Sequence, residues 1–128
     1  MSTDRQGDKR LRALRGATSV AANTGAAIVA GTRALLEEMI ARNEVNLDDI
    51  VSVIFTATAD LDAEFPAAAG REIGIGNVPL MCAREIEVPG DVVRCVRVLM
   101  HLYSGRDYAS LRHVYLGEAR QLRTDLPD

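Results

Sequence analysis

The stretch VSVIFTAT, from Val51 to Thr58, most constrains how this chain folds. It is apolar and rich in β-branched residues, which is typical of a buried strand. The segment before it has another period, because apolar residues between Ile28 and Ile40 recur at helical spacing. A buried strand that follows an amphipathic helix favours helices packed on a sheet. The chain is therefore predicted to be α/β or α+β.

Other segments extend this alternation of strands and helices along the chain. Asn23 or Thr24 is suited to cap the first helix, and Asn46 to open a helical turn in NLDDI. The prediction is a mixed β-sheet packed with one long helix and shorter helices. Further strands are expected at Leu11–Gly16, Val78–Val88 and Leu111–Ala119, and further helices at Pro66–Ile73 and Gly90–Ser104.

The length of 128 residues indicates one domain, expected over 11–128 after a polar tail at 1–10. A hydrophobic content of 48% is typical of a folded protein. The net charge of −3 does not indicate nucleic-acid binding. Charged residues interrupt every apolar run, so no membrane-spanning segment is expected. The tail lacks the apolar region of a secretory signal, so a cytoplasmic protein is expected.

The two cysteines, Cys82 and Cys95, are predicted to be buried, reduced thiols that catalysis does not require. They lack C-x-x-C spacing, and His101 and His113 form no ligand pattern with them. Two aspartates near residue 60 are typical of a turn. We therefore expect no metal and no cofactor.

Motifs for covalent chemistry are also lacking in the sequence. GIGN at Gly74–Asn77 ends a predicted helix and does not follow a strand, so it does not indicate a phosphate loop. Neither a nucleophile elbow nor a set of Ser, His and Asp residues is recognisable. If the chain is an enzyme, its chemistry must use other groups.

Several polar side chains beside apolar segments are better candidates. Arg15 ends a predicted strand and is followed by small residues, so it could be solvated or could meet a ligand near the backbone. Arg97 lies on a predicted helical stripe with Arg94 and His101, facing either water or a polar pocket. Glu85 and Tyr115 lie in predicted strands. Together these residues suit a small anionic ligand without naming it.

The chain resembles a known family, the small monofunctional chorismate mutases of the trimeric, mixed α/β class. The resemblance covers about Leu11–Leu126. The segments that carry it occur in the family's order and at nearly its spacing: LRGAT at Leu14–Thr18, ATADLDAEFPAAAGRE at Ala57–Glu72, VPLMCARE at Val78–Glu85, CVRVLM at Cys95–Met100, RHVYLGEA at Arg112–Ala119 and LRTDL at Leu122–Leu126.

The resemblance implies a role for each of four catalytic residues. Arg15 and Tyr115 would bind a substrate carboxylate, Arg97 would contact the ether oxygen, and Glu85 would accept from the ring hydroxyl. Residues expected to bind substrate are Phe65, Arg71, Met81, Cys82, Ala83, Arg84 and Leu122.

Three points set this chain apart or need explanation. Ala68 and Met81 replace a lysine and a threonine that the family can carry, so altered affinity is expected. The family places Cys82 and Glu85 both near the ligand, whereas strand alternation separates them. A bend or bulge between them would resolve this conflict.

The family's reaction, the [3,3] rearrangement of chorismate to prephenate in aromatic amino acid biosynthesis, explains why no nucleophile, base, metal or cofactor motif is found. The resemblance also implies a homotrimer arranged as a pseudo-barrel, with sites between subunits. Two alternatives are a trimeric enzyme like the small imine deaminases and a non-catalytic trimeric sensor of an anionic metabolite.

Overall fold

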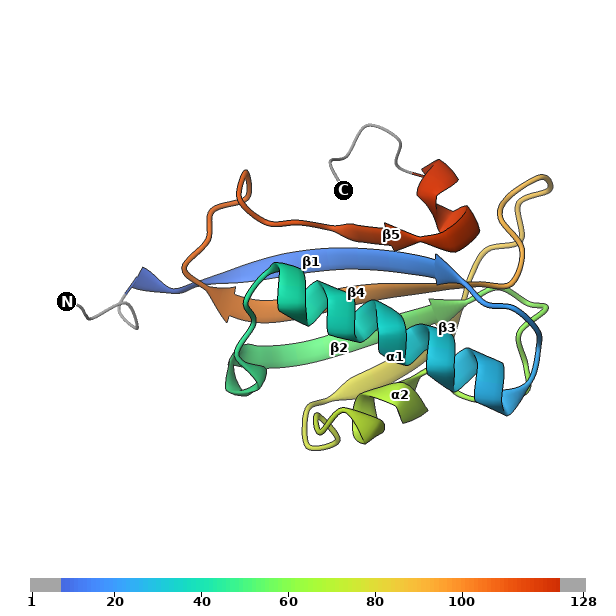
Figure 1. The fold of residues 1–128 in the computed structure, drawn as a ribbon, viewed down its shortest axis with the longest axis horizontal. Coiled ribbons are helices and arrows are strands. Elements are labelled where there is room, and N and C mark those ends of the chain that lie inside the picture. The colour runs from blue at the N-terminus through green and yellow to red at the C-terminus, as the bar shows by residue number, and fades with distance from the viewer. Residues whose placement is uncertain (1–7, 123–128) are drawn as a thin grey trace.

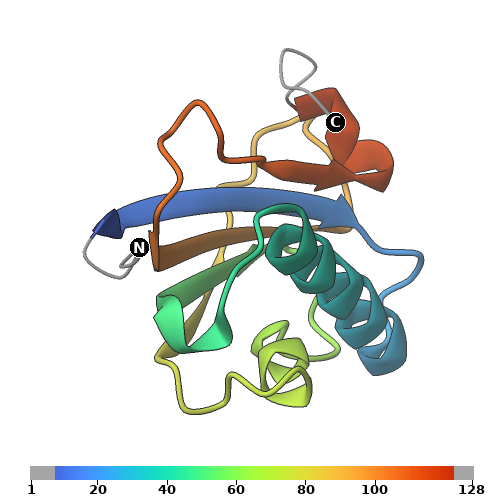
Figure 2. The same ribbon diagram turned by 60° about the vertical axis from the view of Figure 1, so that its left-hand side comes forward.

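The computed structural model describes residues 8–122 and has the mixed α/β architecture that the sequence predicts (Figure 1). One sheet carries the helices α1 (Gly25–Arg42) and α2 (Ala67–Glu72) on the same side (Figures 1 and 2). The strands are β1 (Arg10–Ser19), β2 (Ile50–Ala57), β3 (Leu80–Arg84), β4 (Cys95–Ser104) and β5 (Val114–Leu116), and the 3-10 helices are η2 (Leu47–Asp49) and η3 (Gly117–Leu122).

The strand order across the sheet is β3-β2-β4-β1-β5. Strand β4 pairs antiparallel with both β1 and β2, whereas β3 and β5 add to the two edges in parallel pairs. The connection from β2 to β3 contains α2, as parallel neighbours require a crossover. A strand late in the sequence therefore lies at the centre of the sheet.

Helix α1 covers the sheet as its apolar spacing predicts. The Thr24 hydroxyl accepts a hydrogen bond from the Ala27 N–H at 3.1 Å and caps the first turn. Leu35 and Met39 are fully buried on the face toward β1. A Cβ atom at Gly16 would lie 2.6 Å from the Met39 sulfur, so glycine there allows the helix to approach the strand closely.

The prediction of a helix at Gly90–Ser104 is wrong, because this segment forms a loop followed by strand β4. Residues of β4 alternate between the helix-covered core and the opposite face. Val96 and Val98 are buried in the core, and Arg97 lies between them on the other face. The spacing that suggested a helical stripe with Arg94 and His101 therefore has no structural meaning.

The predicted ends of three other strands also differ from the structure. Strand β1 continues to Ser19, β3 covers only the middle of the predicted Val78–Val88, and β5 covers only Val114–Leu116. Residues 1–7 of the predicted tail lie outside the described residues, and Lys9 forms an ion pair with Asp49 at 2.6 Å. No helix among residues 8–122 is long and apolar enough to cross a membrane.

The two faces of the sheet differ in how they are covered. The face toward α1 and α2 holds the main core, with Phe55 as its largest fully buried side chain. On the opposite face, which we call the outer face, η3 packs over Ala17 and Cys95. Large apolar side chains on the rest of the outer face remain exposed, including Met81 at 62% and Tyr103 at 48%. The outer face therefore offers a surface for substrate or another protein chain.

Candidate active site

Arg97 lies at the centre of a row of residues that crosses the outer face. Its strand neighbours in register are Ala17 on β1 and Thr56 on β2, and Ala17 is in turn paired with Tyr115 on β5. Neighbouring strands lie about 4.8 Å apart, so Tyr115 and Arg97 are separated by roughly 10 Å with only an alanine between them. Ala17 itself is buried beneath η3, so a ligand would have to meet Arg97 and Tyr115 beside this alanine and not over it.

Arg15 belongs to the next row of the outer face. It pairs with Leu99, two residues along β4 from Arg97, so the two arginines lie about 7 Å apart along the strands and about 5 Å apart across them. The Arg15 backbone N–H donates to Nδ1 of His113 at 2.9 Å, which extends the contact between β1 and the segment before β5. The Arg15 side chain is exposed on the same face as Arg97.

Glu85 is held beside Arg97 immediately after strand β3 ends. Its backbone N–H donates to the Ala57 carbonyl at 3.0 Å, which fixes the residue at the sheet. Its Oε2 atom accepts from the Thr56 hydroxyl at 2.7 Å and from Nε of Arg97 at 2.9 Å. The Glu85 side chain is only 10% exposed. An ion pair of this kind fixes the plane of the guanidinium and leaves other N–H groups of Arg97 to face a ligand.

Two contacts of this cluster were not anticipated from the sequence. Thr56 orients Glu85, and Asp91 accepts from Nη2 of Arg97 at 3.2 Å. Strand alternation in VSVIFTAT places Thr56 on the face opposite Phe55, so the sequence does indicate on which side of the sheet this hydroxyl lies. Asp91 lies in the loop between β3 and β4, in the segment wrongly predicted to be helical.

The start of β4 is fixed by contacts with the turn around Asp60, where the sequence indicates only an ordinary turn. Arg94 has a φ of 45°, and its backbone N–H donates to the Asp60 carboxylate at 2.9 Å. The hydrogen bond from the Thr58 hydroxyl, followed by the Arg94 N–H contact, lowers the pKa of Asp60 below its ordinary value. The Thr58 hydroxyl oxygen also accepts from the Cys95 N–H at 3.0 Å. These contacts set the register from which β4 carries Arg97.

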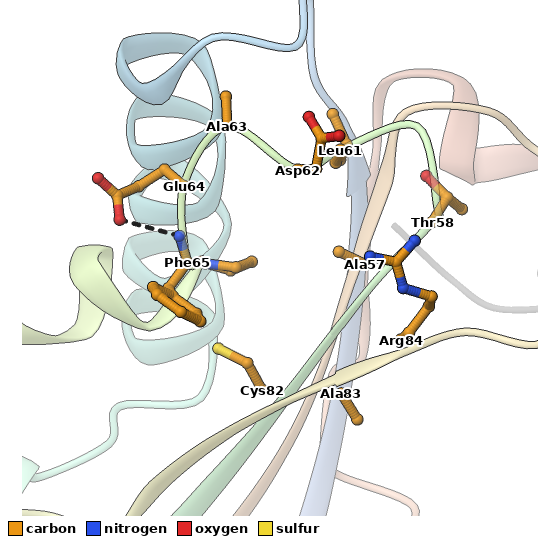
Figure 3. Close-up of a pocket in the computed structure, with 11 residues that line it drawn as sticks. Ala57, Thr58, Leu61, Asp62, Ala63, Glu64, Phe65, Cys82, Ala83 and Arg84 are labelled. Atoms are coloured by element: carbon orange, nitrogen blue, oxygen red, sulfur yellow. Dashed lines mark hydrogen bonds between the residues drawn. The ribbon is translucent and has the colours of Figure 1, made fainter.

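A second group of predicted site residues lies at the β3 edge of the sheet. Phe65, Cys82 and Arg84 line a pocket of about 350 Å³, and the Cys82 sulfur points toward Phe65 (Figure 3). Phe65 is 67% exposed, and Arg84 donates weakly to the Ala59 carbonyl at 3.5 Å. Arg71 is exposed in the last turn of α2, on the helix side of the sheet.

The bulge expected between Cys82 and Glu85 is not found. Strands β2 and β3 pair from Leu80 to Arg84 without a register shift. Cys82 therefore packs against the helix-side core, while Glu85 turns to Arg97 on the outer face. Within one chain, the thiol and the carboxylate lie on opposite sides of the sheet.

The remaining predicted residues divide between the two edges of the outer face. Met81 and Ala83 lie on β3, in register with Ile54 and Thr56, and Leu122 packs near Tyr115 at the β5 edge. Strands β3 and β5 are four strand spacings apart, or roughly 19 Å. One small molecule cannot touch Phe65 and Tyr115 of the same chain.

Cys95 provides no nucleophile for this site. Its side chain is fully buried, and this burial raises the pKa of its thiol to about 11, with the nearby negative charge of Glu85 acting in the same direction. At neutral pH the group is a thiol, which is a weak nucleophile. Both cysteines are free, and Cys82 is only partly buried.

Comparisons with known proteins agree on one family. The family described as chorismate mutase type I matches residues 11–126. The chain is 44% identical to chorismate mutase AroH of Thermus thermophilus, over 91% of this chain and 96% of that protein, and 40% identical to AroH of Bacillus subtilis, over 91% and 92%. The structure of a chorismate mutase from Clostridium thermocellum superposes with a TM-score of 0.84 at 49% identity, over 86% of this chain and 98% of that one.

The chain therefore belongs to the chorismate mutase type I family, and its activity is that of a chorismate mutase, an isomerase. The comparisons do not favour a deaminase or a sensor without activity. The family match extends across both groups of predicted site residues, from Arg15 to Leu122.

Proposed function

We propose that the chain rearranges chorismate to prephenate in clefts that neighbouring subunits of a homotrimer share. The observation that carries this proposal is the cluster of Arg97, Glu85, Arg15 and Tyr115 on the outer face of the sheet. Both cysteines are free thiols, which suits the reducing cytoplasm where we propose that the enzyme works. The direct test is to mix the purified protein with chorismate and follow its ultraviolet absorbance, which falls as prephenate forms.

The reaction requires shape and charge rather than a reactive side chain. Chorismate is a dianion with an enolpyruvyl ether, and its rearrangement breaks a C–O bond and forms a C–C bond within one molecule. No proton moves and no covalent intermediate forms. The site must hold the flexible substrate in a compact chair and stabilise negative charge on the ether oxygen as the C–O bond lengthens.

Arg97 is the proposed donor to the ether oxygen. Its Nε is occupied by Glu85, and Nη1 makes no hydrogen bond within residues 8–122. Nη1 is thus available to the ether oxygen, whereas Nη2 donates to Asp91 and can bond a substrate carboxylate only when that contact is released. The single ammonium group of lysine is less suited to bond both substrate groups together. Because Glu85 is mostly buried and already holds Nε, the donor needs little reorganisation when charge develops.

The other residues of the cluster have complementary proposed roles. Arg15 lies two residues before Ala17 on β1, and Tyr115 pairs with Ala17 from β5, so both side chains can reach one substrate carboxylate at the edge of the residues that η3 covers. Oε1 of Glu85 makes no hydrogen bond within the described part of the chain, which leaves it to accept from the ring hydroxyl of the substrate. Three oriented contacts would fix one conformation of the substrate.

The division of the site residues supports a shared cleft. Arg15 is exposed and Arg97 is partly exposed, and Phe65 and Arg71 are too far away in the same chain to cover them. If the β3 edge of a neighbouring subunit packs against the outer face, its Phe65 and Arg71 can close the cleft. The exposed apolar side chains of the outer face would then be buried between subunits, which favours association.

A shared cleft predicts that two impaired variants rescue each other. Arg97→Ala and Arg71→Ala damage different halves of the site, so equal amounts are unfolded together, refolded as mixed trimers and assayed. About one quarter of the clefts in a ring of randomly mixed subunits then contain two intact halves, which should return a similar fraction of the parental kcat/KM. Each variant refolded alone is the control. A mixture no more active than the average of the two, or a fully active monomer in sedimentation, would contradict the assembly.

Arg15→Ala is expected to raise KM about 10- to 100-fold, with a smaller effect on kcat. The reason is that its carboxylate contact exists in both the bound substrate and the transition state. Steady-state kinetics measure the split directly, and Arg12→Ala, in the same strand on the opposite face, is the control. A fall in kcat with an unchanged KM would mean that Arg15 acts on the transition state instead.

A further inference from the structure

Asp91 is an acidic residue carried by a tight turn beside the active-site cluster. Residues Val88 to Asp91 form a turn closed by a hydrogen bond from the Asp91 N–H to the Val88 carbonyl at 3.1 Å. Pro89 and Gly90 occupy its centre, and the φ of 87° at Gly90 is the value that a type II turn requires. The turn belongs to the exposed loop between β3 and β4, so Asp91 is held by local contacts rather than by the core.

The Asp91 side chain uses its two oxygens differently. Oδ1 accepts from the Val92 N–H at 2.8 Å, a contact within the loop. Oδ2 accepts from Nη2 of Arg97 at 3.2 Å, a contact that joins the loop to the sheet. Nη2 belongs to the outer end of the guanidinium, the end that the proposed mechanism assigns to the substrate.

The two carboxylates on Arg97 are held with unequal strength. Glu85 makes the shorter contact, is only 10% exposed and has a second donor in Thr56, whereas Asp91 is 32% exposed. Exposed ion pairs contribute little because water competes for both partners. A ligand that reaches Arg97 therefore displaces Asp91 far more easily than Glu85.

The charges also oppose binding of an anion while Asp91 remains in place. One guanidinium faces two carboxylates, so this part of the cluster has a net charge of −1 before a dianionic substrate arrives. A carboxylate of the substrate needs the position that Oδ2 of Asp91 occupies. The two groups have the same charge and the same geometry toward Arg97.

We propose that Asp91 is an internal competitor of the substrate at Arg97. In the ligand-free enzyme its carboxylate occupies Nη2, and the substrate carboxylate displaces it by moving the Pro-Gly turn outward. The inference rests on the proposed role of Arg97. Its consequence is a specificity-determining contact, since only a ligand with an anionic group at this position replaces the interaction that Arg97 loses. The enzyme then binds substrate less tightly than Arg97 alone would allow.

Asp91→Asn tests this directly in the full-length chain with chorismate as substrate. The amide oxygen can still accept from the Val92 N–H, but its NH₂ group no longer holds the guanidinium. KM is expected to fall about two- to tenfold, which raises kcat/KM by a similar factor. Glu87→Gln removes the same charge from the same exposed loop and is the matched control. It should leave both constants near the parental values.

Three results would overturn the proposal. An unchanged or higher KM in Asp91→Asn would mean that Asp91 does not compete with substrate. An equal fall of KM in Glu87→Gln would indicate general repulsion of the dianion by the loop. A lower kcat would make Asp91 a residue that orients Arg97 for the reaction. Thermal unfolding of both variants checks that the fold is intact.

A parallel measurement separates this inference from the proposed function. If Arg97→Ala keeps both the parental kcat and the parental KM, Arg97 does not contact the substrate, and the competition proposed for Asp91 fails with the proposed role of Arg97. If Arg97→Ala loses turnover while Asp91→Asn behaves like Glu87→Gln, only the inference about Asp91 is wrong. Prephenate binding, measured by calorimetry on the same variants, should tighten in Asp91→Asn without depending on turnover.

Discussion

Replacing Arg97 with alanine is expected to lower kcat by about 10²–10³-fold, with a smaller change in KM. The physical reason is that the proposed hydrogen bond from Arg97 to the ether oxygen is needed most as negative charge develops in the transition state. Arg97→Lys keeps the charge but loses the planar fork, so it should recover only part of the rate. Steady-state kinetics on the parent and both variants measure these effects.

The Arg97→Ala variant is expected to lose stability as well as turnover, and a second substitution separates the two effects. Removing Arg97 leaves the Glu85 carboxylate, which is 10% exposed, with the Thr56 hydroxyl as its only side-chain hydrogen-bond donor among residues 8–122. An uncompensated carboxylate at such a place destabilises the fold. In the double variant Arg97→Ala with Glu85→Gln, a neutral amide can still accept from Thr56. Stability should return toward that of the parent while turnover stays low. If instead kcat of Arg97→Ala were near the parental value, the electrostatic mechanism would be wrong.

The sequence predicted most elements of the fold because their local signals agree with their tertiary environment. Thr24 precedes an amphipathic segment and caps α1, and Asn46 accepts from the Asp48 N–H at 3.0 Å to open η2. The β-branched run after it forms strand β2, with Val53 and Phe55 buried on the helix side and Val51 exposed. Sheet order could not be predicted in this way, because β4 pairs with β1 and β2 across long stretches of chain.

The error at Gly90–Ser104 arose from competing periodicities. Arg94, Arg97 and His101 have helical spacing, but the valines around Arg97 are β-branched and alternate with it, which is typical of a strand. Arg97 is identified from the sequence by the family's motif and not by its predicted surroundings. A strand explains a lone arginine among valines more simply, because successive side chains point to opposite faces.

The sequence predicts which residues belong to the candidate site, but not on which face of the sheet they lie or which contacts they make. Family motifs point to Arg15, Glu85, Arg97 and Tyr115, and the structure brings these onto one face. The separation of Cys82 from Glu85 follows from an unbroken register in β3, which the sequence alone does not reveal. Asp91 carries no motif at all, and its contact with Arg97 depends on how the Pro-Gly turn folds back toward β4.

The two phenylalanines of the chain are expected to separate stability from function. Phe55 is fully buried at the centre of the helix-side core, whereas Phe65 is 67% exposed at the pocket edge. Phe55→Ala removes a large buried side chain and leaves a cavity, which typically costs about 3–5 kcal/mol of unfolding free energy. For a domain of this size that corresponds to a fall in Tm of roughly 10–20 °C.

Phe65→Ala makes the same chemical change where little packing is lost, so its Tm should stay within about 3 °C of the parent. Its kcat/KM should fall, because the proposed cleft loses an aromatic wall supplied by the neighbouring subunit. Thermal unfolding followed by circular dichroism at one fixed protein concentration compares the two variants, since the proposed subunit association would make Tm depend on concentration. Equal losses of Tm would show that Phe65 is buried by association as deeply as Phe55 is by folding. A stable Phe65→Ala variant with parental kcat/KM would remove Phe65 from the site and weaken the case for a shared cleft.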